Sequence, residues 1–312
     1  MSRVGVIVPV RNGAGTLSEA LASALAHDSV AEVIVVDDGS TDGSDEIARR
    51  MGDDRIRIVP GPCSGISDAF NAGLDAAHAP YIVRCDADDR IASEGLSDRC
   101  DWLDTHRDYV AVSGGFAAMT ARGRHLVDLA DEGEPREATD ALREGHTLTH
   151  FGTWLTRRET LVAVGGARSW FVTAEDIDLQ LRLAGQGRVW HDPRVTYFYR
   201  LHGGSITHTQ ATPERAFYET TARRLASQRR MGETDDLEAG HPPAFDPRLA
   251  KAEGAMSATG HVASLLGGRA WRSLREGRKD LALRYMLRSV RIDPLSVPRW
   301  QGLMKMLLAR RK

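Results

Sequence analysis

The first third of the chain alternates between short apolar runs and longer stretches in which apolar and polar residues are mixed. The apolar runs are rich in Val and Ile, end in glycine or polar residues, and cover residues 4–10, 32–38, 55–61 and 80–86. Such runs are typical of strands that are buried on both faces of a sheet. Between them, apolar residues recur at helical spacing in 16–28, 44–52 and 66–78. This alternation predicts a mostly parallel sheet with right-handed crossovers, an α/β fold.

The pattern changes from about residue 109. Another strand is expected at 109–119, a helix opens at Thr173, and two strand-like pieces follow at 187–192 and 195–202. We expect these elements to complete the same domain, which would then span residues 1–210.

No strand pattern is visible beyond that point. Residues 215–231 have helical spacing, and a segment rich in Gly, Pro and acidic residues near 232–247 is typical of a linker. The tail is helical again, so we expect a second, helical C-terminal region over 211–312.

Composition excludes several classes of protein. The 312 residues are 42% hydrophobic with a formal net charge of -2, which argues against a nucleic-acid partner. Cys63, Cys85 and Cys100 are too few and too irregularly spaced for a disulfide framework or a Cys-based metal site, which favours a reducing compartment. Neither a signal-peptide cleavage site nor an apolar run of membrane-spanning length is recognisable. We therefore expect a cytoplasmic protein.

Acidic residues stand where the expected strands end. Asp37 and Asp38 close the second strand, and Asp86, Asp88 and Asp89 follow the fourth. In parallel sheets ligands bind beyond the carboxyl ends of the strands, so Asp37, Asp38, Asp86 and Asp88 are expected to share one crevice. Carboxylates this close raise one another's pKa unless a cation lies between them. A bound cation and a solvated acidic turn are the two interpretations.

Five motifs in register resemble one known family. VIVPVRNGAGTL, VIVVDDGSTDGS, GISDAFNAGLDAA, YIVRCDADD and TAEDIDLQLRL occur in this order within the first 210 residues. They resemble the inverting glycosyltransferases of family 2 with the GT-A fold. The resemblance implies a Rossmann-like, mostly parallel sheet flanked by helices. It also implies transfer of a sugar from a nucleotide diphosphate-sugar, expected to be a UDP-sugar, to a saccharide or glycolipid acceptor in surface polysaccharide or glycan synthesis.

The resemblance assigns a metal site to the Asp86–Asp88 motif. By the family pattern Asp88 ligates Mn²⁺ or Mg²⁺ and Asp86 lies nearer the ribose; hard cations of this kind prefer carboxylate oxygen. His202 would complete the metal shell or touch the diphosphate, although a histidine among glycines is also a common loop residue. Arg200 and Ser205 would donate to the phosphates.

Other positions are assigned to the nucleotide by the same resemblance. Asp37 and Asp38 would read the base, since a carboxylate suits the N–H donor of uracil. Pro9 and Arg11 would line the pocket from the first strand. Asn71 is also placed there, although Phe70 before it replaces the polar residue that relatives often carry.

The resemblance identifies Asp176 as the general base that deprotonates the acceptor, with Glu175 orienting the acceptor or Asp176 itself. Without the resemblance, Asp176 and Glu175 are explained equally well as acidic residues that the helix dipole favours in a first turn. Trp154 is expected to shape the acceptor side.

Two other functions remain open. A sugar-nucleotidyltransferase would share the α/β architecture, but the first loop lacks the lysine that such enzymes need. A non-catalytic nucleotide-sugar-binding scaffold with a partner-binding tail would be favoured by loss of Asp88 or Asp176, and both are present.

The end of the tail has two interpretations as well. Within residues 296–312, Trp300, Met304 and Leu308 share one face, with Arg299, Lys305 and Arg310 to Lys312 on or beyond the other. This arrangement suits peripheral contact with an anionic membrane, at its inner face. The alternative is a helix docked on its own domain with a solvated basic face.

Overall fold

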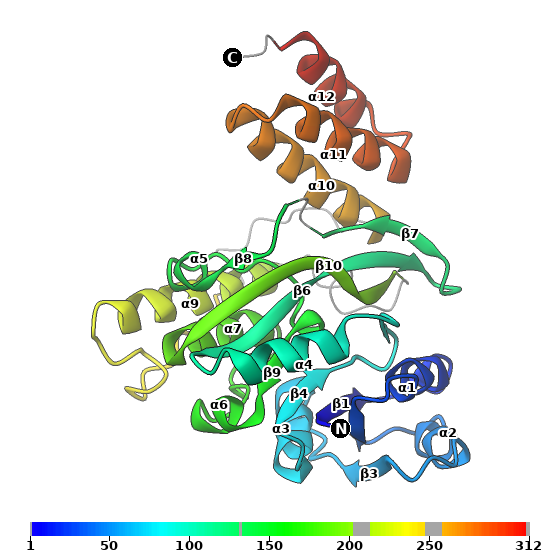
Figure 1. Cartoon of the computed structure of the whole chain (residues 1–312). Helices are drawn as coiled ribbons and strands as arrows, with labels where there is room; N and C mark the ends of the chain where they lie inside the picture. Colours follow the sequence, from blue (N-terminus) through cyan, green and yellow to red (C-terminus); the bar gives the residue numbers. More distant parts are fainter. Residues whose placement is uncertain (1, 131–132, 202–212, 247–257, 310–312) are drawn as a thin grey trace.

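A computed structural model describes residues 2–130, 133–201, 213–246 and 258–309. The strands are β1 (Val4–Val10), β2 (Val30–Asp37), β3 (Ile56–Pro60), β4 (Tyr81–Arg84), β5 (Arg90–Ile91), β6 (Tyr109–Thr120), β7 (His125–Asp128), β8 (Arg136–Glu137), β9 (Leu155–Arg157) and β10 (Arg188–Leu201). The helices are α1 (Leu17–Leu25), α2 (Ser44–Arg50), α3 (Ile66–Ala76), α4 (Leu96–Thr105), α5 (Thr139–Arg143), α6 (Arg158–Ala163), α7 (Glu175–Gln186), α9 (Pro213–Arg230), α10 (Ala258–Arg275), α11 (Lys279–Ile292) and α12 (Val297–Leu308), with the 3₁₀ turn η1 at Phe151–Thr153 (Figure 1).

These strands form one mixed sheet in the order β3-β2-β1-β4-β9-β6-β10-β5, to which β7 and β8 add at β6 and β10. Strands β3, β2, β1 and β4 are parallel, and β6 and β10 are parallel to each other. The short β9 joins the two halves by pairing antiparallel with β4 and β6. The α/β architecture expected from the alternating pattern is confirmed.

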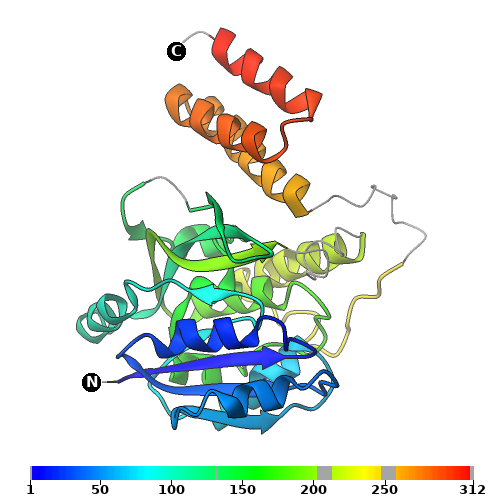
Figure 2. The same ribbon diagram turned by 90° about the vertical axis from the view of Figure 1, so that its right-hand side faces the viewer.

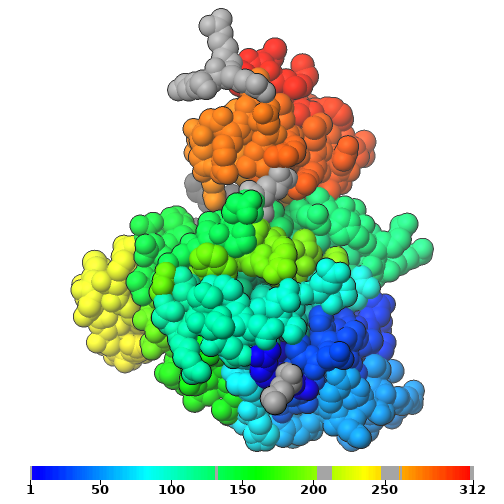
Figure 3. Space-filling view, in the orientation of Figure 1, coloured from blue at the N-terminus to red at the C-terminus, as the bar shows by residue number. Residues whose placement is uncertain are grey.

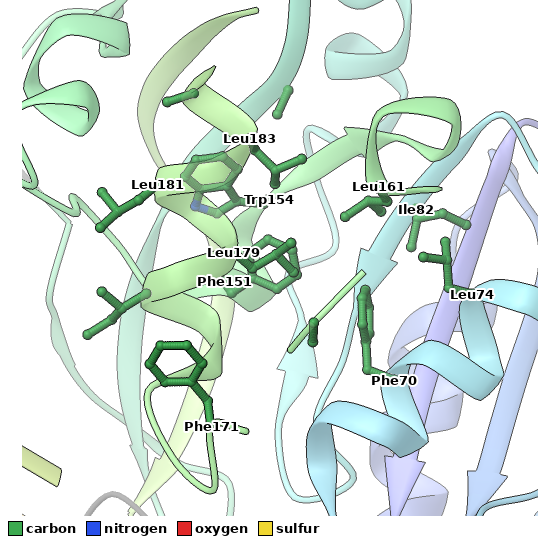
Figure 4. Packing of buried hydrophobic residues seen from close by; sticks show 14 of the residues in the cluster. Phe70, Leu74, Ile82, Phe151, Trp154, Leu161, Phe171, Leu179, Leu181 and Leu183 are labelled. Carbon is green, nitrogen blue, oxygen red and sulfur yellow. The ribbon is translucent and has the colours of Figure 1, made fainter. Parts of the chain in front are cut away.

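Both faces of the sheet are covered. Ile7 of β1 packs in a cluster with Phe70 and Leu74 of α3, whereas its neighbours Val6 and Val8 pack in a second cluster. Alternate side chains of a strand point to opposite faces, so a strand buried on both sides needs apolar residues throughout. Figure 4 shows part of the first cluster, in which Phe151 and Leu161 lie between the side chains of α3 and the leucines of α7.

The two strand pieces expected near residues 187–202 are one irregular strand, β10. Its pairing with β6 shifts register on both sides of Val195. The irregular stretch presses against Gly114 and Gly115 of β6, where an added Cβ would collide with Thr196 and with the backbone of Pro193. The glycine pair therefore makes room for the bulge.

Helix α9 belongs with the α/β domain rather than with the tail. Its Tyr218, Ala222 and Leu225 lie in the same hydrophobic cluster as α3 and α7. The segment that follows is folded against α9, because Asp235 is fully buried and Asp236 bonds Gln228. Helix α9 and residues 235–236 therefore pack with the α/β domain, whereas the boundary near 210 and the linker near 232–247 stay predictions.

Helices α10, α11 and α12 form a separate layer at one end of the molecule (Figures 1 and 2). Val262 and Leu266 of α10 pack with Ala118 of β6, Leu129 after β7 and Leu201 of β10. In the space-filling view of Figure 3 the tail stands out as a lobe on the α/β domain. Among the helices of the described ranges, none is long and apolar enough to cross a membrane.

Candidate functional site

The loops after β1 and β2 are bound to each other. The side chain of Asn12 accepts a hydrogen bond from the backbone N–H of Thr41 (2.8 Å), and Asp42 accepts one from the N–H of Ala14 (2.9 Å). Asn12 has φ 57°, in the left-handed region that asparagine tolerates better than most residues. The two loops therefore form one rigid rim of the crevice expected at the strand ends.

Asp37 and Asp38 have different roles in this rim. Asp38 is 4% exposed, and its carboxylate accepts bonds from the N–H groups of Cys63 (2.7 Å) and Gly65 (3.1 Å). Asp37 is half-buried and accepts a bond from the N–H of Ser40 (2.9 Å). Asp38 thus anchors the loop after β3, which leaves Asp37 the more accessible of the two carboxylates.

Pro9 and Arg11 lie on either side of the end of β1. Pro9 is buried within the strand, and Arg11 is exposed in the loop that follows. Arg11 can therefore reach a ligand at the crevice rim, whereas Pro9 contributes to the shape of the sheet beneath it.

The three aspartates after β4 have separate surroundings. Asp86 pairs with Arg84 (Nε to Oδ1, 2.6 Å). Asp89 is fully buried and accepts bonds from the Tyr197 hydroxyl (2.8 Å) and the backbone N–H of Arg200 (2.7 Å). Asp88 lies between them and is half-buried. The acidic turn is thus held by its outer members, with Asp88 at the centre.

Arg84 connects this turn to helix α7. Its guanidinium bonds Asp86 on one side and the Glu175 carboxylate on the other (Nη1 to Oε1, 2.8 Å). Burial alone would lower the pKa of Arg84, but the two carboxylates outweigh it and raise that pKa. The same guanidinium holds the pKa of Asp86 below its usual value although burial acts to raise it. For Glu175 burial prevails and its pKa is raised.

Helix α7 begins in a way that the sequence pattern does not reveal. The residue before it, Ala174, has φ 59° and ψ 20°, a left-handed conformation that costs a non-glycine residue about 1 kcal/mol. Thr173, the cap expected from sequence, instead accepts a bond from Arg215. The strained residue turns the chain directly before Glu175 and Asp176, and strain of this kind concentrates at functional sites.

Asp176 is half-buried in the first turn of α7. Within the part of the chain that the structure describes, no group donates a hydrogen bond to its carboxylate. It lies close enough to His150 and Glu175 to affect the pKa of each. Its carboxylate is therefore available to accept a proton from a ligand.

His150 closes the site from the segment before η1. Its Nδ1 accepts the N–H of Gly152 (3.1 Å), so the ring proton belongs on Nε2, which lies 3.8 Å from Asp86. Burial lowers the pKa of His150, and the ring stacks on Tyr197 with centroids 5.2 Å apart. His150 is thus a neutral imidazole that faces the acidic turn.

This donor set suits a hard divalent cation. Ligand atoms of Asp86, Asp89 and His150 lie within 4.8 Å of one another, with Asp88 in the same turn. Carboxylate oxygens are ligands that Mn²⁺ and Mg²⁺ accept, and His150 would join them only in its other tautomer, in which Nε2 carries no proton. The excess of carboxylates over arginine gives the site a negative charge that such an ion would neutralise.

Two residues assigned from sequence have structural roles. Asn71 exchanges two 2.8 Å hydrogen bonds with the backbone of Ala167, so its amide ties α3 to the loop before α7. Trp154 is 1% exposed and packs against Phe151 and the leucines of α7 (Figure 4). The amide of Asn71 is thus occupied by the backbone, and the indole of Trp154 is buried with no hydrogen-bond partner for its Nε1 among the described residues. The roles of Asn71 toward the nucleotide and of Trp154 toward the acceptor stay predictions.

Arg200 also makes bonds within the protein. It is 1% exposed, and its guanidinium donates to Glu19 and to the carbonyl oxygens of Asp88 and Ala121. These bonds hold the acidic turn in place and do not favour the expected role as a phosphate donor. His202 and Ser205 lie outside the described residues.

Sequence patterns did not mark Asp89, Tyr197 or Arg84 as site residues. The signal for Arg84 was visible: a charged residue inside an apolar strand must find a buried partner. Tyr197 and Asp89 are 108 positions apart, and only the fold brings them together.

The arrangement combines three capacities in one place. The acidic turn can bind a cation, the rim formed by the first two loops can accept hydrogen bonds from a polar ligand, and Asp176 can take up a proton. Arg84 connects the acidic turn to Glu175, the neighbour of Asp176. Such a site suits a displacement at a centre that carries an anionic leaving group.

Comparison with known proteins bears on this chemistry. Residues 5–164 match the model of glycosyl transferase family 2. The chain is 31% identical over 248 residues to the succinoglycan biosynthesis protein ExoU of Rhizobium meliloti, covering 72% of this chain and 70% of that protein. It is 24% identical over 210 residues to WfaP of Escherichia coli, a UDP-Glc:alpha-D-GlcNAc-diphosphoundecaprenol beta-1,3-glucosyltransferase, covering 66% of this chain and 80% of that one.

The fold has close neighbours among solved structures. Residues 1–349 of S. aureus TarS in complex with UDP-GlcNAc superpose with a TM-score of 0.62 at 17% identity, covering 97% of this chain and 89% of that one. The same protein with UDP gives a TM-score of 0.59. The GT-A architecture expected from the motifs is thereby confirmed, and the chain is a glycosyltransferase of family 2.

Proposed function

We propose that this enzyme is a metal-dependent, inverting glycosyltransferase that moves a sugar from a UDP-sugar to a saccharide or lipid-linked acceptor in the synthesis of a surface polysaccharide. The observation that carries the proposal is the Arg84 bridge, which joins the acidic turn at Asp86 to Glu175, the neighbour of Asp176. A transferase needs its leaving-group site and its base at a fixed separation, and this bridge fixes it.

The donor nucleotide would lie along the rim formed by the first two loops. Asp37 has the accessible carboxylate there and would accept the N–H of the base, while Asp38 holds the loop after β3 in place. Arg11 is exposed beside them and would contact the donor. The UDP-containing names of WfaP and of the TarS complexes favour uracil as the base.

Asp88 and Asp86 would hold Mn²⁺ or Mg²⁺, with His150 facing the same turn and His202 as a further ligand. When bound, such an ion acts as a Lewis acid on the departing diphosphate. The protein's own part is to place the carboxylates. Tyr197, Asp89 and Arg200 hold the acidic turn in place. Arg84 limits the repulsion between the carboxylates of Asp86 and Glu175.

Asp176 would act as the general base. It would remove the proton of the acceptor hydroxyl while that oxygen forms its bond to the anomeric carbon and the bond to the diphosphate breaks. A single displacement of this kind inverts the anomeric configuration. Glu175, held by Arg84, would orient the acceptor or Asp176 itself.

Binding measurements test the proposal directly. Calorimetric titration of UDP, GDP, dTDP and CMP, with and without Mn²⁺, should give Mn²⁺-dependent binding of UDP. Asp88→Ala should abolish the Mn²⁺ dependence, and Asp75→Ala, at an exposed acidic position of α3, should not. Absence of nucleotide binding under every condition would favour the scaffold alternative, and tight binding of another nucleotide would replace UDP as the donor.

A lipid-linked acceptor would bring the enzyme to a membrane surface. Residues 296–312 are the segment for which such contact is expected, and the described part of this segment includes α12.

A further inference from the structure

Charge is divided unequally between the two parts of the chain. Residues 258–312 contain 13 Lys and Arg against 3 Asp and Glu, which leaves 28 against 40 for residues 1–257. The α/β part therefore carries a formal charge of -12 and the tail a charge of +10. A tail of this sign is attracted to an anionic surface, whereas the α/β part is repelled by it.

Helix α12 is apolar on two opposite sides. Gly302, Leu303 and Met306 are buried against the other tail helices. The opposite side forms an outward stripe of exposed residues: Val297 (64%), Trp300 (49%), Met304 (54%), Leu307 (51%) and Leu308 (77%). Their spacing of three, four, three and one places them on one face of the helix.

The stripe residues are not members of the buried cluster that the tail helices form, and α12 lies on the side of the tail away from the sheet in both ribbon views (Figures 1 and 2). Leu295, just before α12, is 92% exposed and extends the stripe. A contiguous apolar face of this kind is typical of an interaction surface rather than of a solvated helix.

Basic residues flank the stripe. Arg291 at the end of α11 and Lys305 in α12 are both exposed, and Arg310, Arg311 and Lys312 follow in the sequence. Arg299, expected from sequence to belong to a solvated basic face, instead turns inward to bond Asp293 and the carbonyl oxygen of Gly260.

We propose that the outward stripe of α12 docks on an anionic lipid bilayer, with the basic residues of the tail at its flanks. Apolar side chains would enter the interface while Lys and Arg meet the headgroups, the arrangement of an interfacial amphipathic helix. This inference extends the proposed function, because it puts the enzyme beside a lipid-linked acceptor, but the binding itself requires no catalysis.

The charges favour a bilayer over another copy of this chain. Two tails would repel each other through their charge of the same sign. The α/β part of a second copy has the opposite charge but offers no matching apolar surface among its described residues. There the exposed large apolar side chains are scattered: Leu126 is in β7, Val162 in α6, Val172 in the loop before α7 and Met231 just after α9.

Vesicle flotation of the full-length protein tests the proposal. Vesicles of phosphatidylcholine with phosphatidylglycerol should bind the protein, and vesicles of phosphatidylcholine alone should bind it at least about tenfold more weakly. The triple variant Trp300→Ser/Met304→Ser/Leu308→Ser should lose about tenfold or more of the binding to anionic vesicles. The variant Arg291→Gln/Lys305→Gln should bind more weakly, with a smaller dependence on salt.

Matched controls separate the possible outcomes. Leu126→Ser/Val162→Ser/Met231→Ser removes three exposed apolar side chains from the α/β part and should leave vesicle binding unchanged. UDP binding measured by calorimetry should be the same in every variant, so failure of membrane docking is distinguishable from failure of the donor assignment. The proposal is overturned if the anionic vesicles do not bind the protein or if the stripe variant binds them as well as the unmodified chain. It is equally overturned if sedimentation velocity shows lipid-free self-association that depends on the stripe.

Discussion

Two groups of buried charged residues contact the same helix, α7, and they differ in the ratio of carboxylates to guanidinium groups. At its first turn, Asp86 and Glu175 share the single guanidinium of Arg84, with Asp88 and Asp176 beside them. Further along, Asp178 and Asp235 are surrounded by three arginines, Arg168, Arg182 and Arg229. The first group has an excess of negative charge, and the second does not.

This difference separates a binding site from an anchor. Buried charges are costly unless they are neutralised, and the second group is neutralised within the protein, where it fastens α7 to α9. In the first group Asp86 and Glu175 share a single guanidinium, an arrangement that a bound cation or a proton would stabilise further. Four predictions test the contrast, from the largest expected effect to the smallest, and a fifth variant tests the opposite dependence on pH.

Asp176→Asn should have the largest effect, and on activity alone. Removing a general base lowers turnover by about 10²–10⁴-fold, while UDP affinity should stay within about twofold because Asp176 lies apart from the nucleotide rim. Steady-state turnover with a competent donor, together with calorimetric UDP binding, measures both. Asp75→Asn is the matched control on an exposed helix position, and comparable activity of the two variants would remove Asp176 from the reaction.

Arg84→Met should reduce both stability and activity. It leaves the Asp86 and Glu175 carboxylates buried without their shared cation, which costs about 3–5 kcal/mol of unfolding free energy. Arg84→Lys keeps the positive charge but lacks the planar guanidinium that bonds both carboxylates. Its stability and turnover should therefore lie between those of the unmodified enzyme and of Arg84→Met. Urea denaturation and the ratio of kcat to KM test this, and an Arg84→Met enzyme with unchanged kcat would contradict the bridge's role.

Asp178→Asn should affect stability alone. The side chain is fully buried and bonds Arg182 (2.7 Å), so losing its charge costs about 2 kcal/mol. Turnover at a temperature well below the Tm should be unchanged. A drop in turnover as large as that of Asp176→Asn would mean that the anchor and the site are not separate.

Glu175→Gln should have the smallest effect on stability, with a sign that depends on pH. Burial raises the pKa of Glu175, so the folded state prefers its protonated form. The group therefore contributes stability below its unfolded pKa near 4.5, and this contribution is lost as the pH rises through the folded pKa. At pH 7 the substitution should raise unfolding free energy by about 1 kcal/mol or less, and at pH 4 it should not.

For Asp235→Asn we expect the opposite dependence of stability on pH. Burial acts to raise the pKa of Asp235, but bonds from the N–H of Glu238 and from Arg168 and Arg229 lower it overall. Its contribution to stability is present above pH 3.8 and is lost as the pH falls through the folded pKa. Thermal unfolding at pH 7 should show a lower Tm for this variant, and equal responses of the two variants would contradict the comparison.

The central strands could be predicted from sequence because both of their faces are buried, which requires long apolar runs. Strands β5, β8 and β9 could not, since two or three residues carry no periodicity. In the tail, apolar residues at helical spacing in α11 include Leu283, Met286, Leu287 and Val290, yet Leu287 is 44% exposed. Tyr285 and Ser289 are buried there instead. A helix that contacts two neighbours has a wider buried face than a single apolar stripe at i, i+3, i+4 and i+7 predicts.

The candidate site was predictable in position but not in detail. Strand ends and acidic motifs placed Asp86, Asp88 and Asp176 near one another. The same residue types also brace loops, however, so the sequence could not separate Asp37 from Asp38 or recognise Asn71 as a backbone clamp. Trp154 was expected to shape the acceptor side, yet an indole also fills a core.

The packing of α10 on the sheet has a practical consequence. Ala118, Val127, Leu129 and Leu201 are covered by the tail, and Leu201 directly follows Arg200, which supports the acidic turn. A chain shortened before residue 258 would present this strip to water and invite aggregation. Anyone who trims the enzyme for crystallisation should therefore replace those four side chains with polar ones, or keep the helices.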